Sequence, residues 1–222
     1  MRIVIAGGHG QIALLLERLL ADRGDSPVGL VRKPEQQEDV REAGAEPVHC
    51  NLETATVEEL AAVLAGADAA VFAAGAGGKG GVGRTEEIDH LGAVRFADAA
   101  ERAGVRRFVQ LSSMGADREP APDTDEGFAA YLRAKGAADA ALVVRSGLDW
   151  TILRPGWLTD DPGTGRVLLA KRTGRGGVPR ADVADVLAHL LHHPETAGLA
   201  LELIGGDTPV LTAVQAAAVN RR

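Results

Sequence analysis

In Ile3-Val4-Ile5-Ala6-Gly7-Gly8-His9-Gly10-Gln11-Ile12-Ala13, near the N-terminus, the sequence indicates its fold most clearly. An apolar run ends at closely spaced glycines and a helical pattern starts directly after them, which predicts a strand, a tight turn and a helix. Gly7 lets the chain turn sharply, Gly10 lets a pyrophosphate approach the backbone, and Ala13 keeps the helix close to the strand. The free N–H groups at the helix N-terminus stabilise negative charge there. The stretch therefore predicts a dinucleotide-binding turn made of Gly7, Gly8, His9, Gly10, Gln11 and Ile12.

Short apolar runs and longer helical patterns go on alternating along the rest of the chain. Strands are expected at 2–7, 27–31, 46–52, 69–74, 107–111, 150–153, 167–170 and 199–204. Helices are expected at 11–23, 35–43, 56–64, 86–103, 128–146, 181–192 and 213–219. Repeated strand–helix units indicate an α/β fold of the Rossmann type, a doubly wound parallel sheet with helices on both faces. We expect residues 1–222 to form a single NAD(P)-binding domain, with a short variable substrate lid at 157–180.

Composition excludes several classes of function. The formal net charge of −7 over 222 residues argues against sequence-independent binding to nucleic acid, which needs an excess of Lys and Arg. Cys50 is the only cysteine, so no internal disulfide can form, and the spacing of Cys and His predicts no metal site. No apolar run approaches the ~18 residues of a membrane helix. We therefore expect a cytoplasmic protein, monomer or homodimer, that acts on a small molecule and binds neither membrane nor nucleic acid.

The end of the second expected strand carries two cations. An acidic residue there would accept hydrogen bonds from the adenosine ribose of NAD, whereas this chain has Arg32 and Lys33, which can pair with a 2′-phosphate. NADP(H) is therefore favoured over NAD(H). The alternative is that both are ordinary solvated loop cations.

Tyr131-Leu132-Arg133-Ala134-Lys135 places a phenol and an ammonium four residues apart, hence on one face of a helix. The ammonium favours the phenolate, so Tyr131 could exchange a proton with a substrate oxygen while hydride moves to or from nicotinamide. Lys135 could also hold the nicotinamide ribose. Ser113, at the end of the fifth strand, could orient the substrate carbonyl, with Ser112 as its competitor.

Four segments carry a resemblance to a known family: 7–12, 73–75, 104–115 and 146–156. With them the chain resembles the atypical short-chain dehydrogenase/reductase superfamily, in its NAD(P)H-binding branch near NmrA-type proteins and flavin or biliverdin-IXβ reductases. The resemblance implies that backbone groups of Ala73, Ala74 and Gly75 line the cofactor. It further implies that Pro155, Gly156, Trp157 and Leu158 border the nicotinamide. It also implies that Asn51-Leu52 touches adenine, although family members usually carry Asp-Leu there.

A glycine-rich segment, 78–85, follows the fourth expected strand. We expect a mobile flap over the cofactor, with Lys79 or Arg84 near its phosphates, or else a surface loop with no such role.

Three functions fit these observations. The leading hypothesis is an NADP(H)-dependent oxidoreductase that reduces a small carbonyl, quinone or flavin-like acceptor. The alternatives are an NADP(H)-sensing regulatory protein without turnover and a sugar-nucleotide epimerase or dehydratase. Substrate specificity is expected to lie in the loops at 115–127 and 157–178.

Overall fold

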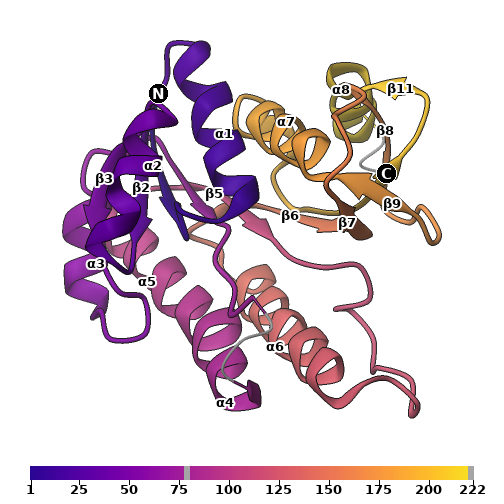
Figure 1. Ribbon diagram of the computed structural model, residues 1–222, viewed down its shortest axis with the longest axis horizontal. Helices are drawn as coiled ribbons and strands as arrows, with labels where there is room; N and C mark the ends of the chain where they lie inside the picture. Colours follow the sequence, from indigo (N-terminus) through magenta and orange to yellow (C-terminus); the bar gives the residue numbers. More distant parts are fainter. Residues whose placement is uncertain (78–80, 220–222) are drawn as a thin grey trace.

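The computed structural model describes residues 1–77 and 81–219, and a mostly parallel sheet with helices on both faces runs through them (Figure 1). The strands of its parallel part are β1 (Arg2–Ala6), β2 (Ser26–Val31), β3 (Glu46–His49), β4 (Ala69–Phe72), β5 (Arg107–Leu111), β6 (Asp149–Pro155) and β10 (Leu199–Gly205). Two further strands, β8 (Arg166–Ala170) and β11 (Thr208–Pro209), extend it: β8 pairs with β10 in the antiparallel direction, and β11 pairs with β8 in the same way. The order in the described part of the chain is β11-β8-β10-β6-β5-β4-β1-β2-β3. This order contains the Rossmann arrangement and confirms the predicted fold class.

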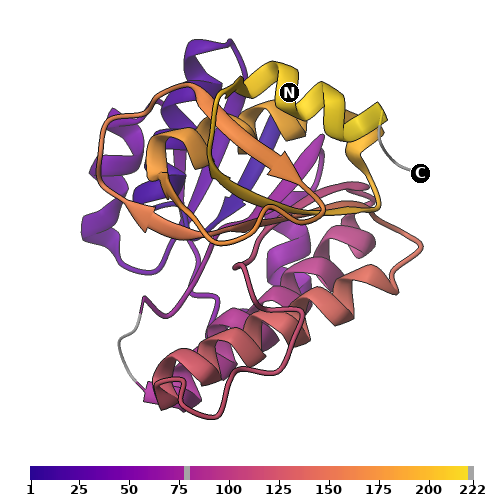
Figure 2. The same ribbon diagram turned by 90° about the vertical axis from the view of Figure 1, so that its right-hand side faces the viewer.

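Two apolar cores separate the layers. One face of the sheet carries α1 (Gln11–Asp22), α7 (Arg180–Leu191) and α8 (Val210–Val219), and the other carries α3 (Val57–Leu64), α5 (Ala93–Ala103) and α6 (Glu126–Val143) (Figures 1 and 2). The shorter helical segments are η1 (Pro34–Gln36), α2 (Gln37–Glu42), α4 (Gly81–Thr85), η2 (Glu86–Gly92) and η3 (Pro194–Thr196). Along β1, Ile3 and Ile5 pack into one core, and Val4 and Ala6 pack into the other. Burial on both faces explains why the strand is a continuous apolar run rather than an alternating one.

The chain reverses direction across the sheet between β1 and β4. From β1 it goes on to β2 and β3 at one edge, whereas β4 leads to β5 and β6 on the other side. Loops that leave in opposite directions open a crevice beyond the carboxyl ends of these two strands, which is where open α/β sheets bind ligands.

Several predicted boundaries were wrong by a few residues. β3 ends at His49 rather than at 52, because Asn51 starts a turn and accepts a hydrogen bond from the Glu53 amide at 3.1 Å. α6 begins at Glu126 rather than at 128, because Asp125 caps it by accepting the Phe128 amide at 3.0 Å. The loop expected at 115–127 therefore ends inside the first turn of a helix.

The C-terminal third contains more regular structure than a lid of loops. β8, which includes the predicted strand at 167–170, pairs with β10 and belongs to the central sheet. Apart from that sheet, β7 (Trp157–Thr159) pairs in parallel with β9 (Gly177–Pro179), and this pairing was not predicted. Two chain segments expected to be loops are thus joined by backbone hydrogen bonds.

The helical region before α5 is longer than predicted. Residues 81–103 are continuously helical, and Glu86–Gly92 form a π-helix, a rare element that often marks a functional site. Arg84 lies in α4 rather than in a flap, and Lys79 lies outside the described residues.

Candidate active site

A cleft of about 1600 Å³ opens at the carboxyl ends of the parallel strands. Sites for a single small ligand usually measure about 300–1,000 Å³, so this cleft has room for a dinucleotide and a second ligand. Of the described residues that the sequence predicted for the site, only Gly8 and Lys33 do not line it. The predicted residues that do are Gly7, His9, Gly10, Gln11, Ile12, Arg32, Asn51, Leu52, Ala73, Ala74, Gly75, Ser112, Ser113, Tyr131, Lys135, Pro155, Gly156, Trp157 and Leu158.

The glycine turn has the geometry that a pyrophosphate site requires. Gly7 has φ +84°, and a Cβ on it would lie 2.6 Å from the Ala74 Cα, so both turn and packing demand glycine. The Gly10 amide donates to the Gly7 carbonyl at 2.9 Å and closes the turn. A Cβ on Gly10 would meet only that carbonyl, at 3.2 Å, and Ala13, at 3.9 Å, so protein packing leaves Gly10 accessible from the cleft. No acidic residue lies in the first turn of α1, so nothing there repels an anion.

Gly8 faces the protein interior instead. Its amide donates to the Leu30 carbonyl at 2.9 Å, and a Cβ on it would lie 2.6 Å from the Gly29 Cα and 2.9 Å from a Glu17 carboxyl oxygen. Glu17 is fully buried, neither of its carboxyl oxygens has a hydrogen-bond partner among the described residues, and burial raises its pKa to about 9. The acid is therefore neutral at physiological pH and places no negative charge behind the turn.

Beside the end of β2, two guanidinium groups that line the cleft converge on one carboxylate. The Glu53 Oε1 atom lies 3.4 Å from Arg32 Nη1 and 2.8 Å from Arg84 Nε. Lys33 turns toward Glu35, 3.5 Å away, which explains why its side chain leaves the cleft. Arg32 and Arg84 are thus the basic side chains that line the cleft here, whereas the sequence had suggested Arg32 and Lys33.

The His9 side chain contacts residues of η1 and α2. Its ring nitrogens lie 2.6 Å from Asp39 Oδ2 and 3.1 Å from Gln36 Nε2. Both His9 and Gln36 line the cleft. These two contacts fix the orientation of the imidazole at the glycine turn, and both partners lie outside the turn.

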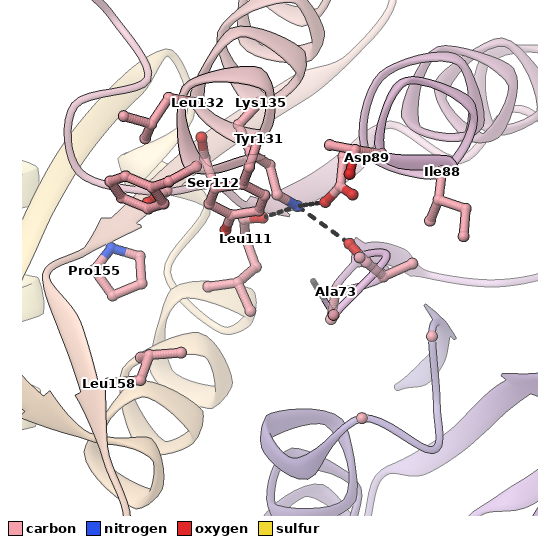
Figure 3. Close-up of a pocket in the computed structure, with 18 of the residues that line it drawn as sticks. Ala73, Ile88, Asp89, Leu111, Ser112, Tyr131, Leu132, Lys135, Pro155 and Leu158 are labelled. Carbon is pink, nitrogen blue, oxygen red and sulfur yellow. Dashed lines mark hydrogen bonds and ion pairs between the residues drawn. The ribbon is translucent and has the colours of Figure 1, made fainter. Parts of the chain in front are cut away.

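Lys135 is buried at the centre of the cleft wall, and three oxygen atoms surround its ammonium. It donates to the carbonyls of Ala74 at 3.1 Å and Leu111 at 3.2 Å, and it forms an ion pair with Asp89 Oδ1 at 3.1 Å. Figure 3 shows Lys135 reaching toward Asp89 beside the Tyr131 ring, with Pro155 and Leu158 across the cavity. A ribose hydroxyl that bonded to Lys135 would therefore have to replace one of these protein oxygens.

Tyr131 lies directly beside this ammonium. The centroid of its ring is 5.8 Å from Lys135 Nζ, and it stacks on Phe128 with 6.0 Å between ring centroids. Burial lowers the pKa of Lys135, but the attraction of Tyr131 and of the Asp89 carboxylate is larger and raises it overall. The structure thus brings together the phenol and the stably charged ammonium that the sequence spacing predicted.

The two candidate serines differ in the hydrogen bonds that their hydroxyl groups form. Ser112 is buried and donates to Asp139 Oδ2 at 2.9 Å, and the same carboxyl accepts hydrogen bonds from Gln110 at 2.7 Å and Arg154 at 2.9 Å. Burial raises the pKa of Asp139 in spite of the opposing effect of Arg154. Within residues 1–77 and 81–219, the Ser113 hydroxyl has only one contact of this kind, 3.5 Å to the Met114 carbonyl. Ser112 is therefore bound into the protein interior, and Ser113 has its hydroxyl available at the cleft.

Sequence reasoning missed Asp89 and Asp139. Asp139 stands four residues after Lys135, so helical spacing alone could have placed the two on one face. Asp89 lies in another helix, and no short-range pattern connects it with Lys135.

Apolar side chains line the opposite end of the cleft. Phe128, Trp157 and Leu158 are 51%, 63% and 37% exposed, and all three line it. Exposed large apolar groups that gather in a concave site are typical of ligand contacts. Gly156 packs so closely on the Gly176 carbonyl that any side chain there would collide with it.

Two features are absent from residues 1–77 and 81–219. None of the helices there is long and apolar enough to cross a membrane. No three His, Cys, Asp or Glu side chains in the same residues are arranged to hold a metal ion.

Comparison with known proteins decides the family. A family model described as NAD(P)H-binding matches residues 7–194. The chain belongs to this NAD(P)H-binding family. The match confirms the predicted resemblance to the NAD(P)H-binding branch of the atypical short-chain dehydrogenases/reductases, and it supports a nicotinamide cofactor.

Three similar proteins align with nearly the whole length of this chain. "Uncharacterized sugar epimerase YhfK" of Bacillus subtilis (strain 168) is 39% identical over 97% of this chain and 99% of its own length. The structure of a "Putative NAD-dependent epimerase/dehydratase" from Bacillus halodurans superposes with a TM-score of 0.89 at 36% identity, over 97% of this chain and 99% of that one. The oxidoreductase ylbE from Lactococcus lactis superposes with a TM-score of 0.86 at 29% identity, over 100% and 99%.

Proposed function

We propose that the protein is an NADP(H)-dependent oxidoreductase that reduces a small carbonyl, quinone or flavin-like acceptor. One observation carries this proposal: Tyr131 and the charged, buried Lys135 line the same cleft as the glycine turn. The likeness to the oxidoreductase ylbE, over the full length of the chain, supports it.

The cleft fits a dinucleotide in shape and in charge. Gly10 leaves the backbone accessible at the N-terminus of α1, where a pyrophosphate is stabilised. Arg32 would bind the 2′-phosphate of NADP(H), which would compete with Glu53 for the guanidinium. Asn51 and Leu52 would contact adenine, Ala73 to Gly75 would line the dinucleotide, and residues 155–158 would border the nicotinamide.

When bound, NADPH supplies the hydride. Tyr131 would donate a proton to the acceptor oxygen, and the positive charge of Lys135 would stabilise the phenolate that remains. Ser113 would donate a hydrogen bond to the same acceptor oxygen, since its hydroxyl is not used by a buried group. Phe128, Trp157 and Leu158 would cover the apolar body of the acceptor and keep water away from it.

The test combines cofactor titration with a screen of acceptors. NADPH oxidation is followed with carbonyl, quinone and flavin compounds, for the wild type and for Tyr131→Phe. We expect Tyr131→Phe to keep the NADPH affinity, because the phenol acts mainly in the transition state, and to lower turnover by about 10²–10⁴. Full turnover in Tyr131→Phe would mean that no protein acid is needed, which favours a flavin-type acceptor. NADPH binding without reduction of any acceptor would favour a sensing protein.

A sugar-nucleotide epimerase is the second candidate, favoured by the name of the Bacillus subtilis relative. Such an enzyme would use the same Tyr131 and Lys135 but return the hydride to its substrate. Incubation with nucleoside-diphosphate sugars would then change the sugar stereochemistry with no net oxidation of the cofactor. Unchanged sugars would count against this candidate.

A further inference from the structure

Glu53 is an acidic side chain at the wall of the cleft, directly after the Asn51-Leu52 pair. Its Oε1 atom lies 2.8 Å from Arg84 Nε and 3.4 Å from Arg32 Nη1. Arg84 also donates to the Ala76 carbonyl at 3.2 Å, which fixes its guanidinium beside the turn after β4. One carboxylate thus connects the residue that follows β2 with α4.

The main chain around Glu53 is held in place without its carboxylate. The Asn51 carbonyl accepts a hydrogen bond from the Ala55 amide at 2.8 Å, and the Asn51 side chain accepts one from the Glu53 amide at 3.1 Å. Arg95, on α5, donates to the Leu52 carbonyl at 2.6 Å. Because these contacts hold backbone groups, a change in the Glu53 side chain leaves the path of the chain as it is.

The ion pairs of Glu53 are accessible to water. The side chains of Arg32, Arg84 and Glu53 are 42%, 25% and 28% exposed. Pairs between charges this accessible contribute little to stability. They do cancel charge, however: the carboxylate leaves one net positive charge on a group whose two guanidinium ions would otherwise both attract an anion.

We propose that Glu53 is a specificity-determining residue, which weakens the binding of NADP(H) relative to NAD(H) by competing with the 2′-phosphate for Arg32. The inference rests on the proposed function, in which Arg32 binds that phosphate. The contact to Arg32 is the longer of the two, so the phosphate takes Arg32 and the carboxylate stays with Arg84. The phosphate and the carboxylate then repel each other across one guanidinium. NAD(H) escapes this repulsion because it has a neutral hydroxyl at the same position.

Fluorescence titrations of the wild type and Glu53→Gln with NADPH and NADH test the proposal. Gln keeps the length of the side chain, and its amide oxygen can accept the hydrogen bond from Arg84, but it carries no charge. We expect Glu53→Gln to bind NADPH about tenfold more tightly, the size expected for a phosphate and a carboxylate about 7 Å apart in a partly exposed site. NADH should bind as it does to the wild type. The gain for NADPH should shrink as the ionic strength rises, because salt screens exposed charges.

Two further variants serve as controls. Glu119 also lines the cleft but pairs with Arg133, so Glu119→Gln should keep the wild-type ratio of the two affinities. In an Arg32→Ala background, Glu53→Gln should raise the NADPH affinity less than it does in the wild type, because the shared guanidinium is gone. An equal gain in both backgrounds would contradict competition for Arg32.

Unchanged NADPH affinity in Glu53→Gln, or equal gains for both cofactors, would overturn the proposal. Weaker NADH binding would overturn it as well, because the carboxylate would then accept hydrogen bonds from the ribose hydroxyls. A merely structural role would lower both affinities together with the thermal stability, which would likewise contradict the proposal. Absent turnover would contradict the proposed oxidoreductase alone, since the affinities are measured without an acceptor.

Discussion

Replacing Glu17 by Gln should stabilise the protein, and more so as the pH rises. Glu17 is fully buried behind the dinucleotide turn, without a hydrogen-bond partner among the described residues for either carboxyl oxygen. Burial raises its pKa from the ordinary value of 4.5 to about 9. Gln has nearly the same shape as Glu, and its amide does not ionise in this pH range.

The size of the effect follows from the two pKa values. Between pH 4.5 and 9 the folded protein keeps the Glu17 proton and the unfolded chain releases it, so stability falls as the pH rises. Each pH unit in this window costs about 1.4 kcal/mol. From about pH 5 to about pH 8 the stability that Gln adds relative to Glu should therefore grow by about 4 kcal/mol, a large part of the 5–15 kcal/mol typical of a domain.

Urea denaturation of both proteins, at a pH near 5 and a pH near 8, measures this difference. Asp22→Asn is the matched control, because Asp22 is an exposed acid at the end of the same helix and its replacement should have the same effect at both pH values. If Glu17→Gln changes the free energy of unfolding equally at both pH values, Glu17 is not buried as a neutral acid and the reasoning is refuted.

Three further predictions concern the cleft. Arg32→Ala should narrow the difference in binding free energy between NADPH and NADH by about 1–3 kcal/mol, the range for charge-assisted hydrogen bonds. Titrations that give equal affinities of the wild type for the two cofactors would contradict this. Gly10→Val should abolish binding of both cofactors in a folded protein, because the side chain would stand where the pyrophosphate lies; unchanged NADPH affinity would remove the turn from the site. Ser112→Ala should lower stability by about 1–2 kcal/mol because Asp139 loses a buried hydrogen bond, whereas Ser113→Ala should lower turnover at unchanged stability. Denaturation and NADPH oxidation of the two serine variants distinguish these roles.

Local patterns in the sequence were sufficient wherever the deciding interactions are themselves local. The helix expected at 56–64 starts at a capping box of Thr56 and Glu59, with the Glu59 amide 3.2 Å from the Thr56 hydroxyl and the Thr56 amide 2.8 Å from the Glu59 carboxylate. The helix expected at 86–103 ends where the sequence indicated, and Gly104 follows it in the left-handed conformation. The apolar runs and glycine turn likewise led to the Rossmann-type sheet, because strand burial and a positive φ are imposed within a few residues.

Tertiary structure decided the contacts between segments that are distant in the sequence. Asp89 and Lys135 meet only because a π-helical turn and α6 pack on the same side of β4 and β5, an arrangement that no helical period of 3.6 residues reveals. The choice between Ser112 and Ser113 depends on which hydroxyl the buried Asp139 takes up. Pairing of β7 with β9 also joins segments about 20 residues apart. A sequence records the donors, acceptors and apolar groups of each segment, but strand register and helix packing determine which of them come within 3 Å, and those depend on the whole fold.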